Sequence, residues 1–369
     1  MKRQILYISS IPWDYAWHRQ QEMMTKMAEE GFDILFVQPC TKNPFKSTLV
    51  KQAEHIWLFS PSGLPYERVL SCIHWYNARM ARRQILKVME EIGFHSPIVW
   101  LDRVHGFDFP FFAQEAFVVY DLIDEILSFG RVRNEKMLLS LENEVLRRAD
   151  LLLTSSQLLA KRKLLQADVP DKSYQFIPNG VDVLRFATVE EWERIKDIPH
   201  PRIGFVGTIG KRRFNCGLLQ SLIERNPEWE FLFVGPQESN VRQELLKKNV
   251  HFFDCVPGEM IPAIINSFDV GIIPYSIDKA DMDYVFPRKA CEFLAAGKPV
   301  VATPLAELSA FEGHIAVADS VEDFEHCIQV ALQDIDGKQE RIEFVKRFDW
   351  NLLLKGLLKE LNKKGGGEE

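Results

Sequence analysis

Residues 286–303 read FPRKACEFLAAGKPVVAT, and this stretch decides the fold of the second half of the chain. Pro287 suits the first turn of a helix, where the N–H that proline lacks would have no partner, and Gly297 suits the position just past a helix end. Residues 300–302, Val-Val-Ala, are typical of a buried strand. A helix that leads directly into a buried strand is a repeating unit of α/β domains.

The same alternation extends outward along most of the chain and predicts parallel sheets covered by helices on both faces. In the first half we expect strands near residues 4–9, 33–38, 55–59, 97–101, 116–121, 150–154 and 174–177, and helices near 18–30, 68–92, 132–149 and 156–167. In the second half we expect strands near 202–207, 230–234, 250–253, 269–273 and 298–302, and helices near 216–226, 238–248, 259–267 and 286–296.

The two series are separated by residues 184–201, which are rich in Glu and Pro, contain no strand pattern and are interpreted as a linker. A length of 369 residues suits two domains of about 150–200 residues each. We expect two tandem doubly wound, Rossmann-like α/β domains that face a cleft. Their expected bounds are 1–183 and 202–345, with a helix over 346–363 that packs back on the first domain and a frayed tail at 364–369.

Composition excludes several functional classes. The net charge is −7, with 23 basic and 23 acidic residues in 1–190 and 22 and 29 in 191–369, whereas a duplex-DNA binder presents a basic domain. The longest apolar runs are far shorter than the roughly 18–20 residues of a membrane span, and the first ten residues hold too short an apolar stretch for a signal peptide. The six cysteines form no CxxC pair. We expect a cytoplasmic protein that binds no nucleic acid.

Familiar catalytic signatures are also missing. The chain has no GxxxxGK[ST], HExxH or GxSxG, and the first strand is followed by SSIPW at residues 9–13 rather than by GxGxxG. Asp281 and Asp283 form a DxD pattern in a late loop, but we expect no metal site there and no cofactor.

The helix predicted after Pro287 offers a site for a diphosphate. Helix N-termini carry partial positive charge and unpaired N–H groups, and Arg288 and Lys289 add two cations. Glu292, one turn further, is placed to accept hydrogen bonds from ribose hydroxyls. A solvated basic helix start explains Lys289 equally well, but it does not explain an acid in so apolar a helix.

This segment resembles the nucleotide-sugar signature of GT-B glycosyltransferases, particularly the retaining enzymes of glycosyltransferase family 4. Further blocks follow in family order, from the first domain's end to residue 303. They are IPNGVD at 177–182, IGFVGTI at 203–209, FLFVGP at 231–236 and DVGIIP at 269–274. The N-terminal half is similar more loosely, and looks closest to bacterial enzymes of the teichuronic acid type that build cell-wall and surface polysaccharides.

The resemblance implies where a nucleotide-sugar donor would bind. Glu292 corresponds to the second glutamate of the family's E-x7-E motif, which contacts ribose, whereas Tyr284 replaces the first, which contacts the donor sugar; Asp283 or Asp281 is the expected substitute. Lys211, Arg212 and Arg213 follow the first strand of the nucleotide domain, where they either meet the diphosphate or form a solvated basic loop. The remaining expected donor-binding residues are Gly207, Thr208, Val256, Pro287 and Lys289. Val256 belongs to the segment 254–257, which is expected to contact the base through backbone groups.

In the first domain, candidate residues lie after predicted strands. His18 and Arg19 open the first helix. They are expected either to contact a phosphate or the acceptor, or to cap the helix. His105 occupies roughly the place of a cleft histidine of the family. Asp121 is expected to contact the acceptor or handle a proton, and Asp124 to bind the acceptor or cap a helix. The expected catalytic set is His105, Asp121, Lys211 and Arg213.

The resemblance implies transfer of a sugar from a nucleoside-diphosphate sugar, UDP favoured over GDP, to a glycan or lipid-linked acceptor, with retention and without a metal. A lipid-linked acceptor would bring the protein to the inner membrane face, through basic stretches at 79–83 and 161–163 that otherwise form solvated helix faces. Two alternatives remain open: a GT-B-fold nucleotide-sugar epimerase, and a non-catalytic nucleotide-sugar-binding scaffold.

Overall fold

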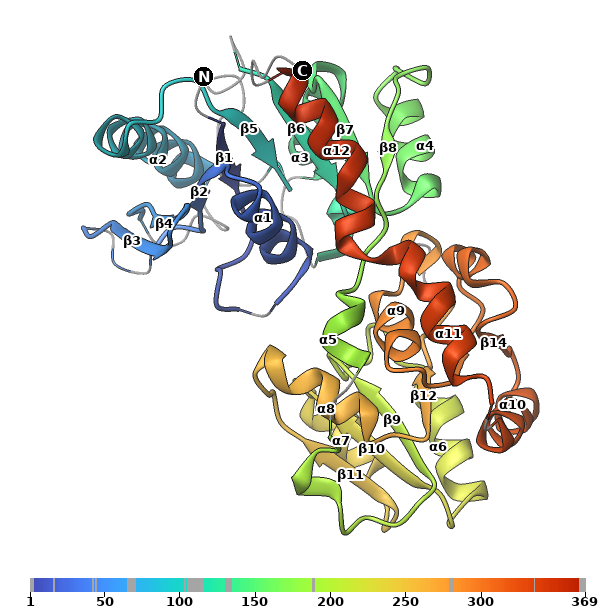
Figure 1. The fold of residues 1–369 in the computed structure, drawn as a ribbon. Coiled ribbons are helices and arrows are strands. Elements are labelled where there is room, and N and C mark those ends of the chain that lie inside the picture. The colour runs from blue at the N-terminus through green and yellow to red at the C-terminus, as the bar shows by residue number, and fades with distance from the viewer. Residues whose placement is uncertain are drawn as a thin grey trace. The chain divides into compact units, whose positions relative to one another are not determined.

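The computed structural model describes residues 3–15, 17–41, 43, 45–64, 71–102, 104, 116–129, 135–187, 190–278, 282–334 and 336–364. The chain divides into two compact units (Figure 1). The first comprises residues 1–178 together with 354–369, and the second comprises residues 179–353. Among the described residues, no helix is long and apolar enough to span a bilayer.

The first unit contains a sheet whose described strands run in the order β3-β4-β2-β1-β5-β6-β7-β8, with only β3 antiparallel to its neighbour. Its elements are β1 (Gln4–Ile8), α1 (Arg19–Glu29), β2 (Asp33–Val37), β3 (Thr48–Ala53), β4 (Ile56–Ser60), α2 (Ser71–Ile92), β5 (Ile98–Leu101), β6 (Val118–Leu122), η2 (Ile126–Phe129), α3 (Glu135–Arg148), β7 (Leu151–Thr154), α4 (Gln157–Gln166) and β8 (Gln175–Phe176). The central strands β1, β5, β6 and β7 are buried along their whole length, as parallel strands covered on both faces are.

The second unit contains a parallel sheet in the order β11-β10-β9-β12-β13-β14. Its elements are α5 (Val183–Ala187), η3 (Glu193–Ile195), β9 (Arg202–Val206), α6 (Cys216–Arg225), β10 (Glu230–Val234), α7 (Ser239–Leu245), β11 (Val250–Phe253), η4 (Gly258–Met260), α8 (Ile261–Asn266), β12 (Val270–Ile273), η5 (Met282–Tyr284), α9 (Arg288–Ala295), β13 (Val300–Ala302), η6 (Ala306–Phe311), β14 (Ala316–Val317), α10 (Val321–Gln333), α11 (Lys338–Val345), η7 (Lys346–Phe348) and the start of α12 (Trp350–Lys364).

In each sheet, the first described strand lies between two strands that the chain visits on opposite sides of it. In the first unit the chain leaves β1 toward β2 and returns to the other side at β5; in the second it leaves β9 toward β10 and returns at β12. In open α/β sheets, ligands bind outside the carboxyl ends of the strands at such a switch point. These two places are therefore where each unit is expected to hold a ligand.

The predicted linker differs from the structure, and the C-terminal helix begins four residues later than predicted, at Trp350. Residues 184–201 lie inside the second unit, where Trp192 and Ile195 are buried and the Trp192 N–H donates to the Ser267 hydroxyl at 2.6 Å. The helical stretch after Gly337 is broken at Asp349 into α11, η7 and α12. Residues of α12 from Leu354 on belong to the first unit, where Gln175 of β8 donates to Glu360 (Figure 1).

Candidate functional site

At the carboxyl end of the second sheet, two glycines let neighbouring strand ends approach closely. Gly207 follows β9 with φ of +141°, and Gly235 follows β10 with φ of +135°. A Cβ on Gly235 would lie 2.4 Å from the Gly207 carbonyl oxygen, so a side chain does not fit there. This backbone, which glycine adopts far more readily than other residues, leaves an open turn at the strand ends.

Lys289 crosses this turn from the first turn of α9. A Cβ built on Gly207 would lie 2.4 Å from Lys289 Cε and 2.8 Å from its Nζ, so the lysine occupies the space that glycine leaves. The ammonium lies over the Phe205 ring, 5.4 Å from its centroid. Pro287 is the N-cap of α9 and no side chain caps the helix. A helix N-terminus and a lysine ammonium therefore converge beside Gly207, an arrangement suited to an anion.

The basic run after β9 is arranged differently from the sequence expectation. The backbone of the loop after β9 is hydrogen-bonded to the segment after β12, where the Ser276 N–H donates to the Arg213 carbonyl at 2.7 Å. The Lys211 ammonium lies 2.8 Å from a Glu244 carboxylate oxygen, and this hydrogen-bonded pair raises the pKa of the lysine. The Lys211 side chain thus pairs with a carboxylate of α7. Arg212 and Arg213 are half-buried.

The other expected donor residues lie on neighbouring segments of the second unit. Glu292 is 8% exposed and accepts from Arg288 at 2.8 Å, one helical turn away on α9. A ribose would therefore have to share that carboxylate with Arg288. Among the other expected donor residues, Tyr284 and Val256 are half-buried, whereas Asp283 and Thr208 are exposed. The described residues contain no group of three or more potential metal ligands; Asp281 lies outside them.

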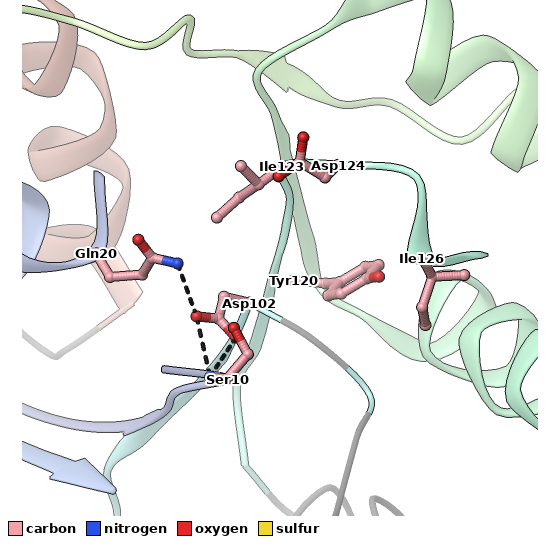
Figure 2. Close-up of a pocket in the computed structure, with 7 residues that line it drawn as sticks. All are labelled: Ser10, Gln20, Asp102, Tyr120, Ile123, Asp124 and Ile126. Carbon is pink, nitrogen blue, oxygen red and sulfur yellow. Dashed lines mark hydrogen bonds between the residues drawn. The ribbon is translucent and has the colours of Figure 1, made fainter. Parts of the chain in front are cut away.

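The first unit has a small pocket at its own switch point, beyond the carboxyl ends of β1, β5 and β6 (Figure 2). Ser10 follows β1, Asp102 follows β5, and Gln20 lies in the first turn of α1. The remaining described lining residues come from β6 and the segment that follows it: Tyr120, Ile123, Asp124 and Ile126. Asp124, one of the predicted acceptor-binding residues, is half-buried and lines this pocket.

Asp102 is the polar centre of the pocket, although it was not among the predicted site residues. Its carboxylate accepts from the Ser10 N–H at 3.0 Å, the Gln20 side-chain amide at 3.1 Å and the Tyr7 hydroxyl at 3.4 Å. Burial raises the pKa of Tyr7 well above its ordinary value, and the charge of Asp102 adds to the effect. A carboxylate directly after an all-apolar strand, as in IVWLD, was the signal available in the sequence.

Asp121 and Arg19 have a structural role rather than the predicted acceptor contact. The Arg19 guanidinium forms a two-point pair with Asp121, both distances 2.9 Å, and donates to the carbonyls of Ile177 at 2.6 Å and Pro178 at 3.0 Å. Arg19 is 3% exposed and Asp121 is fully buried. Because each charge is satisfied by the other in the interior, neither is presented to a ligand, and the pair anchors the end of the first unit.

Lys163 is likewise buried, which corrects its predicted contact with lipid. Its ammonium lies 2.5 Å from Glu125 and 2.7 Å from Glu142, and Glu142 also accepts from the Tyr120 hydroxyl at 3.1 Å. Burial raises the pKa of Glu142, whereas Lys163 acts in the opposite direction. The cluster fixes Tyr120 at the pocket wall.

Of the two predicted histidines, only His18 lies within the described residues. His18 is exposed at the N-cap of α1, and its N–H donates to the Gln21 side chain at 3.1 Å. His105, predicted as a cleft histidine, lies outside the described residues.

Comparison with known proteins finds a similarity within the second unit. Residues 200–334 match the family described as "Glycosyl transferases group 1". The candidate diphosphate turn at Gly207 and Lys289 lies within the matched residues. A curated relative, the "Putative teichuronic acid biosynthesis glycosyltransferase TuaH" of Bacillus subtilis (strain 168), is 29% identical over 239 residues, which is 61% of this chain and 59% of the relative.

Solved structures extend the similarity of fold over the whole chain. Sucrose-phosphate synthase from Thermosynechococcus elongatus matches with a TM-score of 0.76 at 15% identity, covering 100% of both chains. Anabaena HepE in complex with UDP and glucose matches with a TM-score of 0.70 at 15% identity, covering 97% of this chain and 99% of that one. The predicted GT-B fold, with two α/β domains built on parallel sheets, is confirmed.

Proposed function

We propose that this protein is a glycosyltransferase that moves a sugar from a nucleoside-diphosphate sugar to a glycan or lipid-linked acceptor in surface or cell-wall polysaccharide synthesis. The observation that carries the proposal is the Lys289 ammonium at the start of α9, packed over the side-chain-free Gly207 at the end of β9. The match of residues 200–334 to group 1 glycosyltransferases supports the reaction class, and the name of the Bacillus relative supports the polysaccharide context.

In this proposal the diphosphate lies across the turn at Gly207. Lys289 and the N–H groups of the first turn of α9 stabilise the negative charge that develops on the leaving group. The acceptor hydroxyl attacks the anomeric carbon on the same face from which the diphosphate departs, and this gives retention of configuration. A diphosphate oxygen takes the proton of the hydroxyl. Charge stabilisation by lysine and helix dipole requires no metal, and we propose a metal-independent reaction. UDP is the favoured nucleotide, supported by the UDP and glucose complex of HepE, which has the same fold.

We also propose a cytoplasmic protein that touches the inner membrane face through α2 when the acceptor is lipid-linked. Trp75, Tyr76 and Leu86 are 47%, 50% and 45% exposed on that helix. Arg79 and Arg83, one and two turns from Trp75, are exposed on the same side. Aromatic and basic side chains together suit the interface of an anionic bilayer, to which each basic residue contributes about 1 kcal/mol.

Sedimentation with phosphatidylcholine vesicles, with and without phosphatidylglycerol, tests the membrane contact. We expect binding only to the anionic vesicles, and Arg79→Ala/Arg83→Ala should abolish most of it. Arg148→Ala, a half-exposed arginine on α3 of the same unit, is the control for loss of charge. Equal binding by both vesicle types, or by the double variant, would contradict the contact.

Turnover assays separate the proposed reaction from its alternatives. With UDP-sugars and a bacterial glycan acceptor, a transferase forms nucleoside diphosphate only as glycoside appears. An epimerase releases free 2-epimer without acceptor. A scaffold, favoured by Tyr284 in place of the donor-sugar glutamate, binds donor tightly and turns over nothing. Transfer with retained anomeric configuration, unaffected by a chelator, is the expected result.

A further inference from the structure

We infer that Asn179 is a positioning residue for the candidate diphosphate site: it holds the start of α9 and thereby places Lys289 beside Gly207. The inference rests on the proposed function, because it concerns the turn that binds the diphosphate in that reaction. It goes further in naming a residue outside that turn, and outside the residues that match the glycosyltransferase family, on which the affinity for the diphosphate depends.

Asn179 belongs to the block IPNGVD at 177–182 and is the first residue of the second unit. Its side chain is half-buried, and the amide nitrogen Nδ2 donates to the Phe286 carbonyl at 3.2 Å. Phe286 directly precedes Pro287, the N-cap of α9. This hydrogen bond therefore joins the chain at Asn179 to the residue from which α9 starts.

A second contact of Asn179 reaches one turn into the same helix. The Sγ atom of Cys291 donates to the Asn179 carbonyl oxygen at 3.5 Å. Burial raises the pKa of the Cys291 thiol well above its ordinary value, so the thiol keeps its proton at neutral pH and can act as a donor. Lys289 lies between Phe286 and Cys291 in the sequence, and the two contacts of Asn179 thus bracket the turn that carries the lysine.

The residues that follow Asn179 are fixed by another segment of the second unit. A Cβ on the buried Gly180 would lie 2.8 Å from the Phe348 carbonyl oxygen and 2.8 Å from the Trp350 ring, so no side chain fits there. The Val181 N–H donates to the Phe348 carbonyl at 3.0 Å, and the Trp350 N–H donates to the Val181 carbonyl at 3.2 Å. A residue whose own backbone is held in this way can position the helix that it contacts.

The place of α9 matters because Lys289 fits closely beside Gly207. The space of a Cβ on Gly207 is taken by the end of the lysine, 2.4 Å from Cε and 2.8 Å from Nζ, and the ammonium lies 5.4 Å from the centroid of the Phe205 ring. A displacement of the first turn of α9 by about 1 Å is enough to cost tenfold or more in the binding of a ligand held there. Without the Asn179 amide, we expect such a displacement.

The test is a double-mutant cycle on the full-length protein, measured by isothermal titration calorimetry with UDP, or with GDP, ADP, dTDP or CDP if one of these binds instead. Asn179→Ala removes the amide, and Asn179→Leu removes it while nearly keeping the shape of the side chain, in case the alanine variant does not fold. Both are made in the wild type and in Lys289→Ala. Asn226→Ala is the control, because the buried Asn226 amide donates to the Leu222 carbonyl at 3.0 Å, at the end of α6 and away from α9.

We expect Asn179→Ala and Asn179→Leu to weaken diphosphate binding about tenfold when Lys289 is present, and by less than about twofold when it is alanine. Asn226→Ala should leave the affinity within about twofold of the wild type. Unchanged affinity in a folded Asn179 variant, an equal loss in the Lys289→Ala background, or an equal loss in Asn226→Ala would overturn the inference.

Alkylation of Cys291 gives a second readout that needs no ligand. Cys291 is fully buried, whereas Cys255 is exposed and serves as the internal reference. After brief treatment with iodoacetamide, peptide mass spectrometry should show Cys291 labelled about three- to tenfold faster in either Asn179 variant than in the wild type, because one hydrogen bond that holds the helix start is lost. Equal labelling of Cys291 in the wild type and both variants would show that Asn179 does not hold α9.

Binding to the wild type distinguishes the two possible failures. If a diphosphate binds and the cycle is additive, Asn179 has no part in positioning Lys289 and the glycosyltransferase proposal stands. If none of the five diphosphates binds, the proposed function fails and the inference fails with it, whatever the labelling of Cys291.

Discussion

A methyl group added at Gly207 is the sharpest perturbation of the candidate donor site. The backbone there has φ of +141°, and the new Cβ would lie 2.4 Å from Lys289 Cε and 2.8 Å from Nζ. An alanine in such a conformation costs on the order of 1–3 kcal/mol of folding free energy. The contact itself is relieved cheaply, because the flexible end of Lys289 swings away. Gly207→Ala should therefore both destabilise the fold and displace Lys289.

The loss of Lys289 from the turn sets the expected change in affinity. A hydrogen bond to a charged group contributes about 1.5–3 kcal/mol, so Gly207→Ala and Lys289→Ala should each weaken nucleoside-diphosphate binding by about 10- to 150-fold. Only Gly207→Ala should also lower the free energy of unfolding. Isothermal titration calorimetry measures the affinity for the nucleoside diphosphate, and urea denaturation measures the free energy of unfolding.

A double-mutant cycle decides whether the two changes act through the same contact. Once Lys289 is alanine, Gly207→Ala should cost little further affinity. Gly313→Ala is the matched control: its φ is +82° and nothing lies within 4 Å of an added Cβ, so it should lower stability without changing affinity. Full additivity of the two losses, or unchanged affinity in the folded Gly207→Ala variant, would refute the reasoning.

Three further outcomes follow from the other ion pairs. Asp121→Asn should lower the free energy of unfolding by about 3–5 kcal/mol, because it strands the buried charge of Arg19, and urea denaturation of a variant as stable as the wild type would contradict this. Lys211→Ala should leave nucleoside-diphosphate affinity unchanged in calorimetry, since its ammonium pairs with Glu244; a tenfold loss would return Lys211 to the site. Burial raises the pKa of Glu142 above 4.5, so its stabilising contribution is complete below pH about 4.5 and is lost as pH rises through the folded pKa. The stability of the wild type relative to Glu142→Gln should therefore fall from pH 4 to 8 in denaturation curves, and a rising difference would contradict the assignment.

Most of the fold was predictable from sequence because its strands are buried on both faces and read as short apolar runs. The stretch at 286–303 behaves as expected, with α9 from Arg288 to Ala295 and β13 from Val300 to Ala302. The antiparallel edge strand β3 was missed, since five of its six residues are exposed and only pairing with β4 defines it. Helix α10 was missed although Ser320 caps it by accepting from the Asp323 N–H, a pattern visible in the sequence.

The candidate site was predictable only where local sequence carries the chemistry. Lys289 beside a helix start belongs to one motif, and the turn glycine at 207 to another, so both could be proposed from sequence, and the structure brings them together. The pairing of Arg19 with Asp121 joins residues 102 positions apart, and no local pattern reveals that two candidate site residues neutralise each other. Lys163 was misassigned for the same reason, because its burial depends on carboxylates from other elements.

The central claim is that the turn at Gly207 and Lys289 binds the diphosphate of a sugar nucleotide. A thermal-shift panel with UDP, GDP, ADP, dTDP and CDP, with and without magnesium, tests it most directly. A diphosphate at about 100 times its dissociation constant should add roughly 2.7 kcal/mol to stability. The account predicts that one nucleotide, UDP first, stabilises the wild type equally with or without magnesium. It should stabilise Lys289→Ala by only roughly 0.3–1.4 kcal/mol at the same concentration, given a 10- to 150-fold weaker affinity. Stabilisation by none of the five, or equal stabilisation of Lys289→Ala, would contradict it.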